Sequence, residues 1–165
     1  MTTEQFKQQI LPFHAMMYGV AKATLESEDD ACDAVQDSMM SLWQKRDSLP
    51  SVANLRAYCA ASVRNQCMTM VRERAVHRQE SLEVAPAVVD DSTEKRVDDA
   101  DAIARLSNVI DRLPASQAEV MRLSAFGGLS NDEIAQATGL DNQNVRALLS
   151  RGRRKIKEMF IKLNS

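Results

Sequence analysis

Residues 128–155, "GLSNDEIAQATGLDNQNVRALLSRGRRK", contain two short helical patterns separated by one glycine. Ser130 is a favourable N-cap residue, and Glu133 lies three positions later, where its side chain can complete a capping box. Gly139 lies where the first helix should end, since glycine tolerates the positive φ of a helix C-cap. Asp141 can then cap the second helix. The spacing predicts a helix-turn-helix motif.

The second helix of this motif is expected to be apolar on one face and basic on the others. Residues 146–162 contain seven basic residues and one acidic residue, Glu158. Such a concentration is typical of a surface that binds phosphates, so DNA is the favoured ligand, and a helical hairpin with a solvated basic face is the alternative. Small side chains at Ala135 and Gly139 should let the two helices approach each other. The expected apolar face consists of Val145, Leu149, Gly152, Ile156, Met159 or Phe160, and Leu163.

The composition excludes several classes of protein. Five glycines, four prolines and no sustained alternation of apolar and polar residues favour an all-α chain. No apolar run approaches the length of a membrane span and the N-terminus lacks a signal-peptide pattern, so we expect a cytoplasmic protein with no membrane contact. The cysteines, Cys32, Cys59 and Cys67, have no close-spaced pair, and we expect them to be small buried residues. Because His14 and His77 lie far apart without a catalytic motif, we expect no metal, no cofactor and no enzymatic activity.

Charge is segregated along the chain, although the net charge is only -2. Residues 26–37 contain six acids and no base, residues 64–78 contain four arginines and one acid, and residues 80–101 contain eight acids and two bases. Acidic segments joined to one basic helix should oppose binding to DNA, because they repel the phosphates that the arginines attract. The chain is therefore expected to bind DNA weakly alone and to need a partner.

The periodicity predicts two small helical domains joined by an acidic, flexible linker. Residues 1–78 form the first domain, residues 79–98 lose the helical pattern and form the linker, and residues 99–165 form a second domain that contains the helix-turn-helix. The helices of the first domain are expected at residues 4–25, 29–45 and 51–77. Their buried sides should carry Phe6, Ile10, Phe13, Met17, Val35, Met39, Leu42, Trp43, Leu55, Tyr58, Val63, Cys67, Met70 and Val71.

Two separated stretches resemble one known family. "DDACDAVQDSMMSLWQKRDSLPSVANLRAYCAASVRN", residues 29–65, is similar to the acidic helix and the promoter-opening helix of the extracytoplasmic-function group of bacterial RNA polymerase sigma factors. "LPASQAEVMRLSAFGGLSNDEIAQATGLDNQNVRALLSRGRRKIKE", residues 113–158, resembles the C-terminal helix-turn-helix domain of the same group. The resemblance implies a promoter-specificity subunit that binds core RNA polymerase, recognises two promoter elements and helps to open the duplex.

The resemblance also implies specific partners. Core polymerase is expected to bind through the clamp helices of its largest subunit and the flap of its second-largest subunit, and an anti-sigma factor is a further expected partner. The free chain is expected to be a monomer. Trp43 would be a buried anchor for the polymerase-binding face, and the acidic linker resembles the connector that lies in the RNA exit path. The residues that the resemblance assigns to polymerase binding are Asp30, Asp33, Gln36 and Asp37.

Two sets of residues are expected to contact promoter DNA on the same basis. Tyr58 stands where a tryptophan is frequent in the family, and Leu148 replaces a residue that is often basic, so the preferred bases stay open. The set implied for the minus-ten element is Arg56, Tyr58, Arg64, Asn65 and Thr69, with Arg72, Arg74 and Arg78 available for phosphates. The set implied for the minus-thirty-five element is Asn131, Asp132, Gln143, Asn144, Arg146, Ala147, Ser150, Arg151, Arg153 and Arg154.

Two other functions remain open from the residues themselves. A conventional helix-turn-helix regulator would bind DNA as a dimer and read paired half-sites about one helical turn apart. A helical adaptor would bind only protein and would show no dependence of DNA binding on salt.

Overall fold

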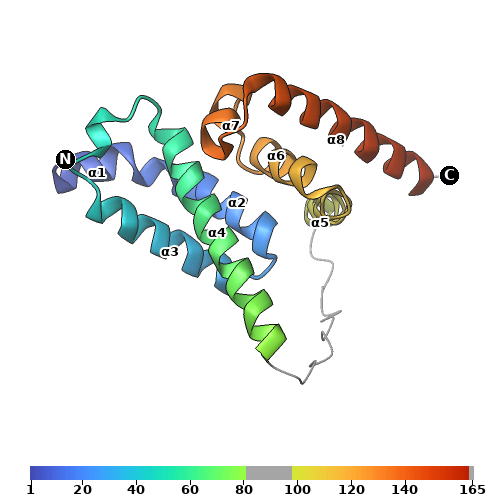
Figure 1. Ribbon diagram of the computed structural model, residues 1–165, viewed down its shortest axis with the longest axis horizontal. Helices are drawn as coiled ribbons and strands as arrows, with labels where there is room; N and C mark the ends of the chain where they lie inside the picture. The colour runs from blue at the N-terminus through green and yellow to red at the C-terminus, as the bar shows by residue number, and fades with distance from the viewer. Residues whose placement is uncertain (81–97, 164–165) are drawn as a thin grey trace.

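The computed structural model describes residues 1–80 and 98–163, and every regular element in these two ranges is a helix (Figure 1). The predicted all-α class is therefore confirmed. Most of the predicted linker, residues 81–97, lies outside the described residues. The N-terminal elements are α1 (Thr3–Gln9), the 3₁₀ turn η1 (Leu11–Phe13), α2 (His14–Leu25), α3 (Glu28–Gln44), the 3₁₀ turn η2 (Leu49–Ser51) and α4 (Leu55–Glu80). The C-terminal elements are α5 (Asp98–Asp111), α6 (Ala115–Ala125), α7 (Asn131–Thr138) and α8 (Asn142–Leu163).

The first predicted helix is interrupted. The prediction of one helix over residues 4–25 is wrong, because the chain passes from α1 through η1 before α2 begins. Pro12 lies within η1 and has no backbone N–H to donate, so the α-helical ladder cannot continue through it. The backbone N–H of Phe13 instead donates to the carbonyl of Ile10 at 2.9 Å, which closes a tighter turn.

The third predicted helix begins later than expected. Pro50 lies in η2, and α4 starts only at Leu55, where the side chain of Asn54 accepts the backbone N–H of Ala57 at 3.0 Å. The far end of α4 extends away from the other helices (Figure 1), and Val71 is 44% exposed. The expectation that Val71 is buried is therefore wrong; its side chain lines a solvent-accessible cavity together with Val20 of α2 and Leu123 of α6.

The predicted helix-turn-helix is present in α7 and α8. Ser130 Oγ accepts the backbone N–H of Glu133 at 3.2 Å, and Glu133 Oε1 accepts the backbone N–H of Ser130 at 3.0 Å, which completes the capping box. Gly139 has a φ of 80°, and Asp141 Oδ1 accepts the backbone N–H of Asn144 at 2.7 Å. These three predictions of caps are confirmed.

Close packing between two helices depends on Gly152 and not, as expected from the sequence, on Gly139. A Cβ atom added to Gly139 would meet nothing within 4 Å, so Gly139 serves the turn through its backbone angle and not through its size. In α8, a Cβ atom added to Gly152 would lie 2.9 Å from Met121 Cγ on α6. The absence of a side chain at Gly152 therefore lets α8 lie against α6.

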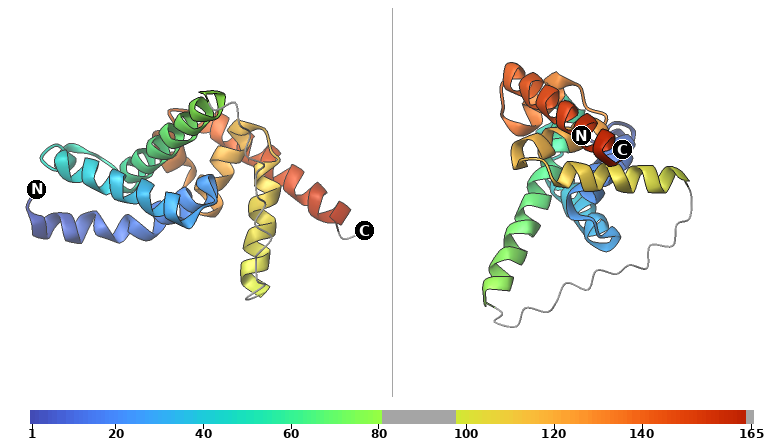
Figure 2. Two further views of the ribbon diagram at one scale, coloured as in Figure 1. Left: turned by 90° about the horizontal axis from the view of Figure 1, so that it is seen from below. Right: turned by 90° about the vertical axis from the view of Figure 1, so that its right-hand side faces the viewer.

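The two helical domains pack on each other. In the N-terminal domain α2, α3 and α4 contact one another, and in the C-terminal domain α8 contacts α6 and α7. Helix α4 also lies against α7, and α2 lies against α6 (Figures 1 and 2). One hydrophobic cluster therefore runs from Phe6 to Leu149. Helix α8 runs along one edge to the C-terminus, at the opposite end of the molecule from the N-terminus (Figure 1).

The cysteines divide into two groups. Cys59 and Cys67 are buried between the N-terminal helices, and burial raises the pKa of their thiols to about 12 and about 11. Both are therefore unreactive packing residues, as expected. Cys32 is exposed on α3, so the expectation that it is buried is wrong. Its side chain lies on the solvent-facing side of α3 beside Asp33, whereas Ala31, Ala34 and Val35 of the same turn are buried.

Candidate nucleic-acid and polymerase interfaces

Helix α8 presents a row of exposed arginines. Its buried face is formed by Val145, Leu149 and Gly152, which pack toward α6 and α7. The other faces are therefore turned to solvent, as the periodicity predicted. Within the described residues the arginines of this row have no ion-pair partner, so their donors are available to a ligand. The exposed candidates on this helix are Gln143, Asn144, Arg146, Ser150, Arg151, Arg153 and Arg154, and Ala147 is half-buried among them.

The starts of α7 and α8 are held together by a polar contact. Asn142 Nδ2 donates to the carboxylate of Asp132, which joins the first turn of α7 to the first turn of α8. Asn131 is half-buried beside it, and Asp132 is exposed. These two candidates thus lie at the end of the motif from which the exposed row of α8 begins.

A polar cavity of about 260 Å³ lies between α3 and α4. Its lining includes three candidates for the minus-ten element, Tyr58, Asn65 and Thr69. Asn65 lies about two turns after Tyr58 on α4, and Thr69 lies about one turn after Asn65. An aromatic ring beside amide and hydroxyl groups provides both a stacking surface and hydrogen-bond partners for an unstacked base. Lys45, at the end of α3, adds a positive charge at the same cavity.

Sequence reasoning missed several residues of this cavity. Besides Lys45, the lining includes Ser38, Ser41, Leu42, Ala61, Ser62 and Gln66. A helical signal for two of them was available, because Ser62 and Gln66 lie four and eight positions after Tyr58 and so share its face of α4. The residues from α3 had no such signal, since only tertiary packing brings α3 against α4.

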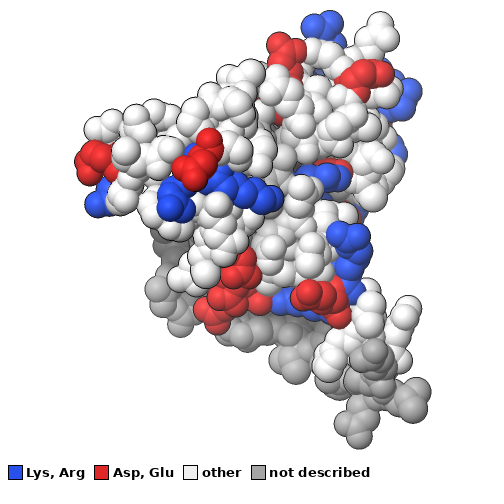
Figure 3. Space-filling model, turned by 60° about the vertical axis from the view of Figure 1, so that its left-hand side comes forward, with Lys and Arg blue, Asp and Glu red and all other residues white. Residues whose placement is uncertain are grey.

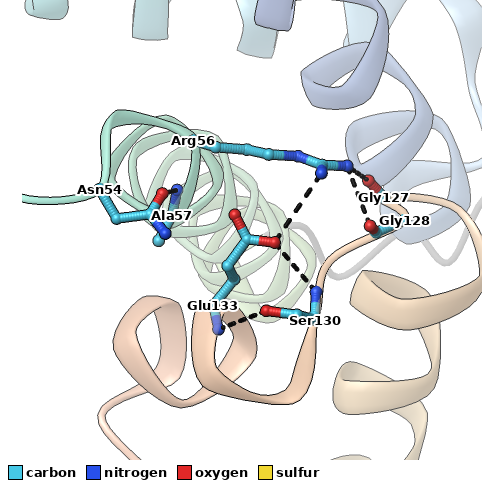
Figure 4. A network of polar contacts seen from close by, with 7 residues as sticks. All are labelled: Asn54, Arg56, Ala57, Gly127, Gly128, Ser130 and Glu133. Atoms are coloured by element: carbon cyan, nitrogen blue, oxygen red, sulfur yellow. Dashed lines mark hydrogen bonds and ion pairs between the residues drawn. The ribbon is translucent and has the colours of Figure 1, made fainter.

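Two arginines assigned to the same promoter element point elsewhere. Arg56 Nη2 donates to the backbone carbonyls of Gly127 at 3.0 Å and Gly128 at 2.9 Å, and Arg56 Nη1 lies 3.8 Å from Glu133 Oε1 (Figure 4). Arg64 forms an ion pair with Glu119 of α6. The structure therefore brings Tyr58, Asn65 and Thr69 together and places Arg56 and Arg64 against the C-terminal domain.

The acidic candidates on α3 are partly engaged by α4. Asp30 forms an ion pair with Arg74, and Asp37 accepts a hydrogen bond from Gln66 Nε2 at 3.2 Å. Asp33 and Gln36 are exposed. Figure 3 shows one face of the molecule, on which acidic and basic side chains lie beside one another in small groups separated by broad uncharged surface.

Trp43 links α3 to α1. Its ring meets that of Phe6 edge to face, with the centroids 5.1 Å apart, and the guanidinium of Arg46 lies 4.3 Å from the centroid of Trp43. Edge-to-face and cation–π contacts of this kind each contribute about 0.5–1.5 kcal/mol beyond burial of the rings. The indole therefore fixes the start of the chain against the end of the acidic helix.

A carboxyl pair lies where α2 approaches α5. A side-chain hydrogen bond with Asp111 raises the pKa of Glu26, and partial burial raises it further. Arg122 Nη2 donates to Asp111 Oδ1 at 2.7 Å, which compensates the negative charge of that carboxylate. Among residues 1–80 and 98–163, no cluster of three histidine, cysteine or carboxylate side chains could hold a metal ion. None of the helices in these ranges is long and apolar enough to cross a membrane.

Two family profiles match the chain. The profile described as Sigma-70 region 2 matches residues 10–76, and the one described as Sigma-70, region 4 matches residues 103–156. The ECF RNA polymerase sigma factor SigM of Mycobacterium tuberculosis is 26% identical over 160 residues, which amount to 97% of this chain and 79% of that protein. The similarity thus extends over both helical domains.

Two solved structures share the fold. The sigma factor RpoE in complex with the anti-sigma factor NepR from Bartonella quintana superposes with a TM-score of 0.76 at 24% identity, over 96% of this chain and 98% of that chain. CnrH in complex with the cytosolic domain of CnrY superposes with a TM-score of 0.72 at 22% identity, over 98% of this chain and 90% of that chain.

Proposed function

Because the chain belongs to the extracytoplasmic-function group of sigma-70 factors, we propose that its two domains divide the recognition of a promoter between them. A sigma factor directs promoter recognition with core RNA polymerase and so initiates transcription. A sigma factor differs from the two alternative functions, a dimeric regulator and an adaptor that binds only protein, because it acts on DNA together with core polymerase. The chain does no bond chemistry itself, and it acts in the cytoplasm as a monomer until polymerase binds it.

Residues 1–78 dock on core polymerase and read the minus-ten element. The exposed acids of α3, with Asp33 at their centre, bind the clamp helices of the largest subunit, where charge complementarity sets register and association rate. The cavity between α3 and α4 supports the proposal for strand opening, because its lining offers an aromatic ring and hydrogen-bonding groups to an unpaired base. Tyr58 stacks on an unpaired base there, and Asn65 and Thr69 supply hydrogen bonds to its edge.

Residues 99–165 read the minus-thirty-five element. Helix α8 enters the major groove with the first exposed residues, Gln143, Asn144 and Arg146, toward the bases. Arg153 and Arg154, two turns later, hold phosphates. This domain also contacts the flap of the second-largest polymerase subunit.

An anti-sigma factor is a second partner. Both structural relatives were solved with such a protein or with a cytosolic domain bound to them, which supports an equivalent partner for this chain. An inhibitor of this kind acts by covering surfaces that polymerase would otherwise use.

The test compares Asn65→Ala on two templates. On duplex promoter DNA the variant should initiate about two- to tenfold more slowly, which corresponds to the loss of one hydrogen bond to a base. On a template with a pre-melted bubble its activity should return to that of the wild type, because the opening step is bypassed. Asn108→Ala, an exposed amide on α5, is the matched control and should have no effect on either template. Equal losses of Asn65→Ala on both templates would instead indicate a role in folding or docking.

A further inference from the structure

The cavity between α3 and α4 has a single charged residue in its lining. Lys45, at the end of α3, is exposed there, and among the described residues no carboxylate lines the same cavity. The two acids nearest to Lys45 in the sequence have contacts elsewhere, since Asp37 accepts a hydrogen bond from Gln66 and Asp47 lies 3.5 Å from the amino group of Met1. The cavity therefore carries a net positive charge.

Lys45 differs from the next residue, Arg46, in having no contact within the chain. The guanidinium of Arg46 lies 4.3 Å from the centroid of the Trp43 ring, and its Nη1 donates to the Trp43 carbonyl at 3.0 Å. Within residues 1–80 and 98–163, the ammonium group of Lys45 has neither a hydrogen bond nor an ion pair. All three of its N–H groups are therefore available to a ligand.

The end of α3 would repel an anion without this lysine. The backbone carbonyls in the last turn of a helix carry a partial negative charge, and the last turn of α3 contains no basic residue. Lys45 is the C-cap residue that follows this turn. Its ammonium group consequently makes the edge of the cavity attractive to a phosphate.

The other polar groups of the cavity suit a neutral partner. Ser38 and Thr69 each donate the hydroxyl hydrogen to the backbone carbonyl four positions earlier, at 2.8 and 3.0 Å. Their oxygen lone pairs, the amide of Asn65 and the ring of Tyr58 remain for a ligand. Ser38 is buried and Thr69 is half-buried, whereas Lys45 is exposed. The cavity thus has a neutral interior and a charged edge, as a nucleotide has a neutral base and a charged phosphate.

We propose that Lys45 binds the backbone phosphate of the nucleotide whose base enters the cavity. The ammonium group holds the anion at the exposed edge while the base lies inside, so Lys45 positions the strand and does not read its sequence. Because the ammonium group stays in water, its contact with the phosphate depends on salt. This inference rests on the proposed function, since it takes the cavity to bind a base of the opened strand.

A phosphate contact of this kind favours the opened promoter over the closed one. The phosphate reaches Lys45 only when its own base has left the duplex and entered the cavity. A contact that one of two states makes and the other lacks shifts the equilibrium toward the first state. Lys45 should therefore contribute to promoter opening more than to the initial binding of duplex DNA.

The primary test measures the affinity of holoenzyme for a promoter fragment that is pre-melted over the minus-ten element. Lys45→Gln keeps most of the side-chain length and removes the charge, so affinity should fall by about threefold to tenfold at low salt. Losing one contact to a single strand lowers the logarithmic salt slope by about 0.7. The ratio of wild-type to variant affinity should therefore shrink by about 2.5-fold between about 50 and 200 mM salt.

Two further variants serve as controls. Lys45→Arg keeps the positive charge and should bind the pre-melted fragment as the wild type does, because both cations bind phosphate. Lys7→Gln removes a charge from an exposed lysine of α1 that does not line the cavity, and it should change neither the affinity nor the salt slope.

Replacing single phosphates of the melted segment by neutral methylphosphonates identifies the partner of Lys45. At one position the replacement should weaken wild-type binding by the same factor as Lys45→Gln, and Lys45→Gln should cause no further loss there. At every other position the wild type and the variant should be affected equally. This double-mutant cycle joins one side chain to one phosphate.

Two results would overturn the role of Lys45. Wild-type affinity of Lys45→Gln for the pre-melted fragment would mean that Lys45 does not contact DNA. A loss of the same size at every methylphosphonate position would mean that Lys45 only stabilises the end of α3. The proposed function fails in a different way, because wild-type holoenzyme would then bind the pre-melted fragment no better than the duplex.

Discussion

Helices α4 and α8 both carry several arginines, but the surroundings of these arginines differ. On α8, Arg146, Arg151 and Arg153 are exposed, and within the described ranges no carboxylate pairs with them. On α4, Arg56 and Arg64 bind acceptors of the other domain. A basic helix thus becomes a free ligand surface only where no neighbouring element of the same chain supplies acceptors.

The difference follows from where the two helices lie. Helix α8 is at an edge of the molecule and packs only through the face that carries Val145 and Leu149. Helix α4 lies between the two domains, with α2 and α3 on one side and α7 on another. Guanidinium groups in the middle of a structure meet carbonyls and carboxylates at short range, whereas those at an edge meet water.

The largest expected effect comes from truncating a buried side chain beneath the exposed arginines of α8. Leu149 is 1% exposed, and Leu149→Ala should lower the free energy of unfolding by about 2–5 kcal/mol, because it leaves a cavity beneath α8. Chemical denaturation measures the loss. Ile161→Ala on the same helix is the control, since Ile161 is 59% exposed and its truncation should change stability little. Equal losses would show that the C-terminal end of α8 is also packed.

The acidic helix offers the next largest effect. Asp33→Lys combined with Asp37→Lys should weaken binding to core polymerase by about 2–3 kcal/mol, because like charges would then face each other at the clamp. Co-purification and titration with core enzyme measure the change, and circular dichroism checks that the helices persist. Unaltered binding with an intact helical spectrum would contradict the docking assignment of α3.

A comparison within α8 separates base readout from phosphate binding. Arg146→Ala should change the preferred upstream sequence, with about 1–3 kcal/mol of discrimination lost at one base pair. Arg154→Ala should weaken binding evenly over all sequences and reduce the logarithmic salt slope by about 0.9. Both follow from position, since Arg146 lies in the first turns of α8 and Arg154 two turns later.

The measurement is holoenzyme affinity for a randomised upstream element at several salt concentrations. A uniform loss of affinity in Arg146→Ala would remove it from the residues that read bases.

The smallest effect concerns a paired arginine and a free one. Arg74 is bound to Asp30, but its side chain is 46% exposed, so Arg74→Ala should cost less than about 1 kcal/mol of stability. Arg153→Ala should cost nothing measurable, because Arg153 is exposed and has no ion-pair partner within residues 1–80 and 98–163. Thermal unfolding of both variants tests whether the distinction between paired and free arginines extends to the exposed end of α4. A larger loss in Arg153→Ala would contradict it.

Local chemistry determined much of this protein in advance. The capping box of Ser130 and Glu133, the left-handed Gly139 and the cap at Asp141 involve residues at most four positions apart, so the sequence specifies them without reference to the rest of the chain. The apolar stripe of α8 was equally legible from its helical period. The break at Pro12 was also encoded locally, although the apolar period that continues across it concealed the interruption.

Tertiary structure decided the contacts between distant segments. Arg56 meets Gly127 and Gly128 across more than 70 positions of sequence, and Lys45 joins Tyr58 in one cavity only because α3 packs on α4. Helical periodicity reports which face of a helix is apolar, but it carries no information about which other helix will cover that face. The partners of polar side chains between two helices are therefore set only when the helices have packed. The same packing decides which of these side chains stay available to DNA or polymerase.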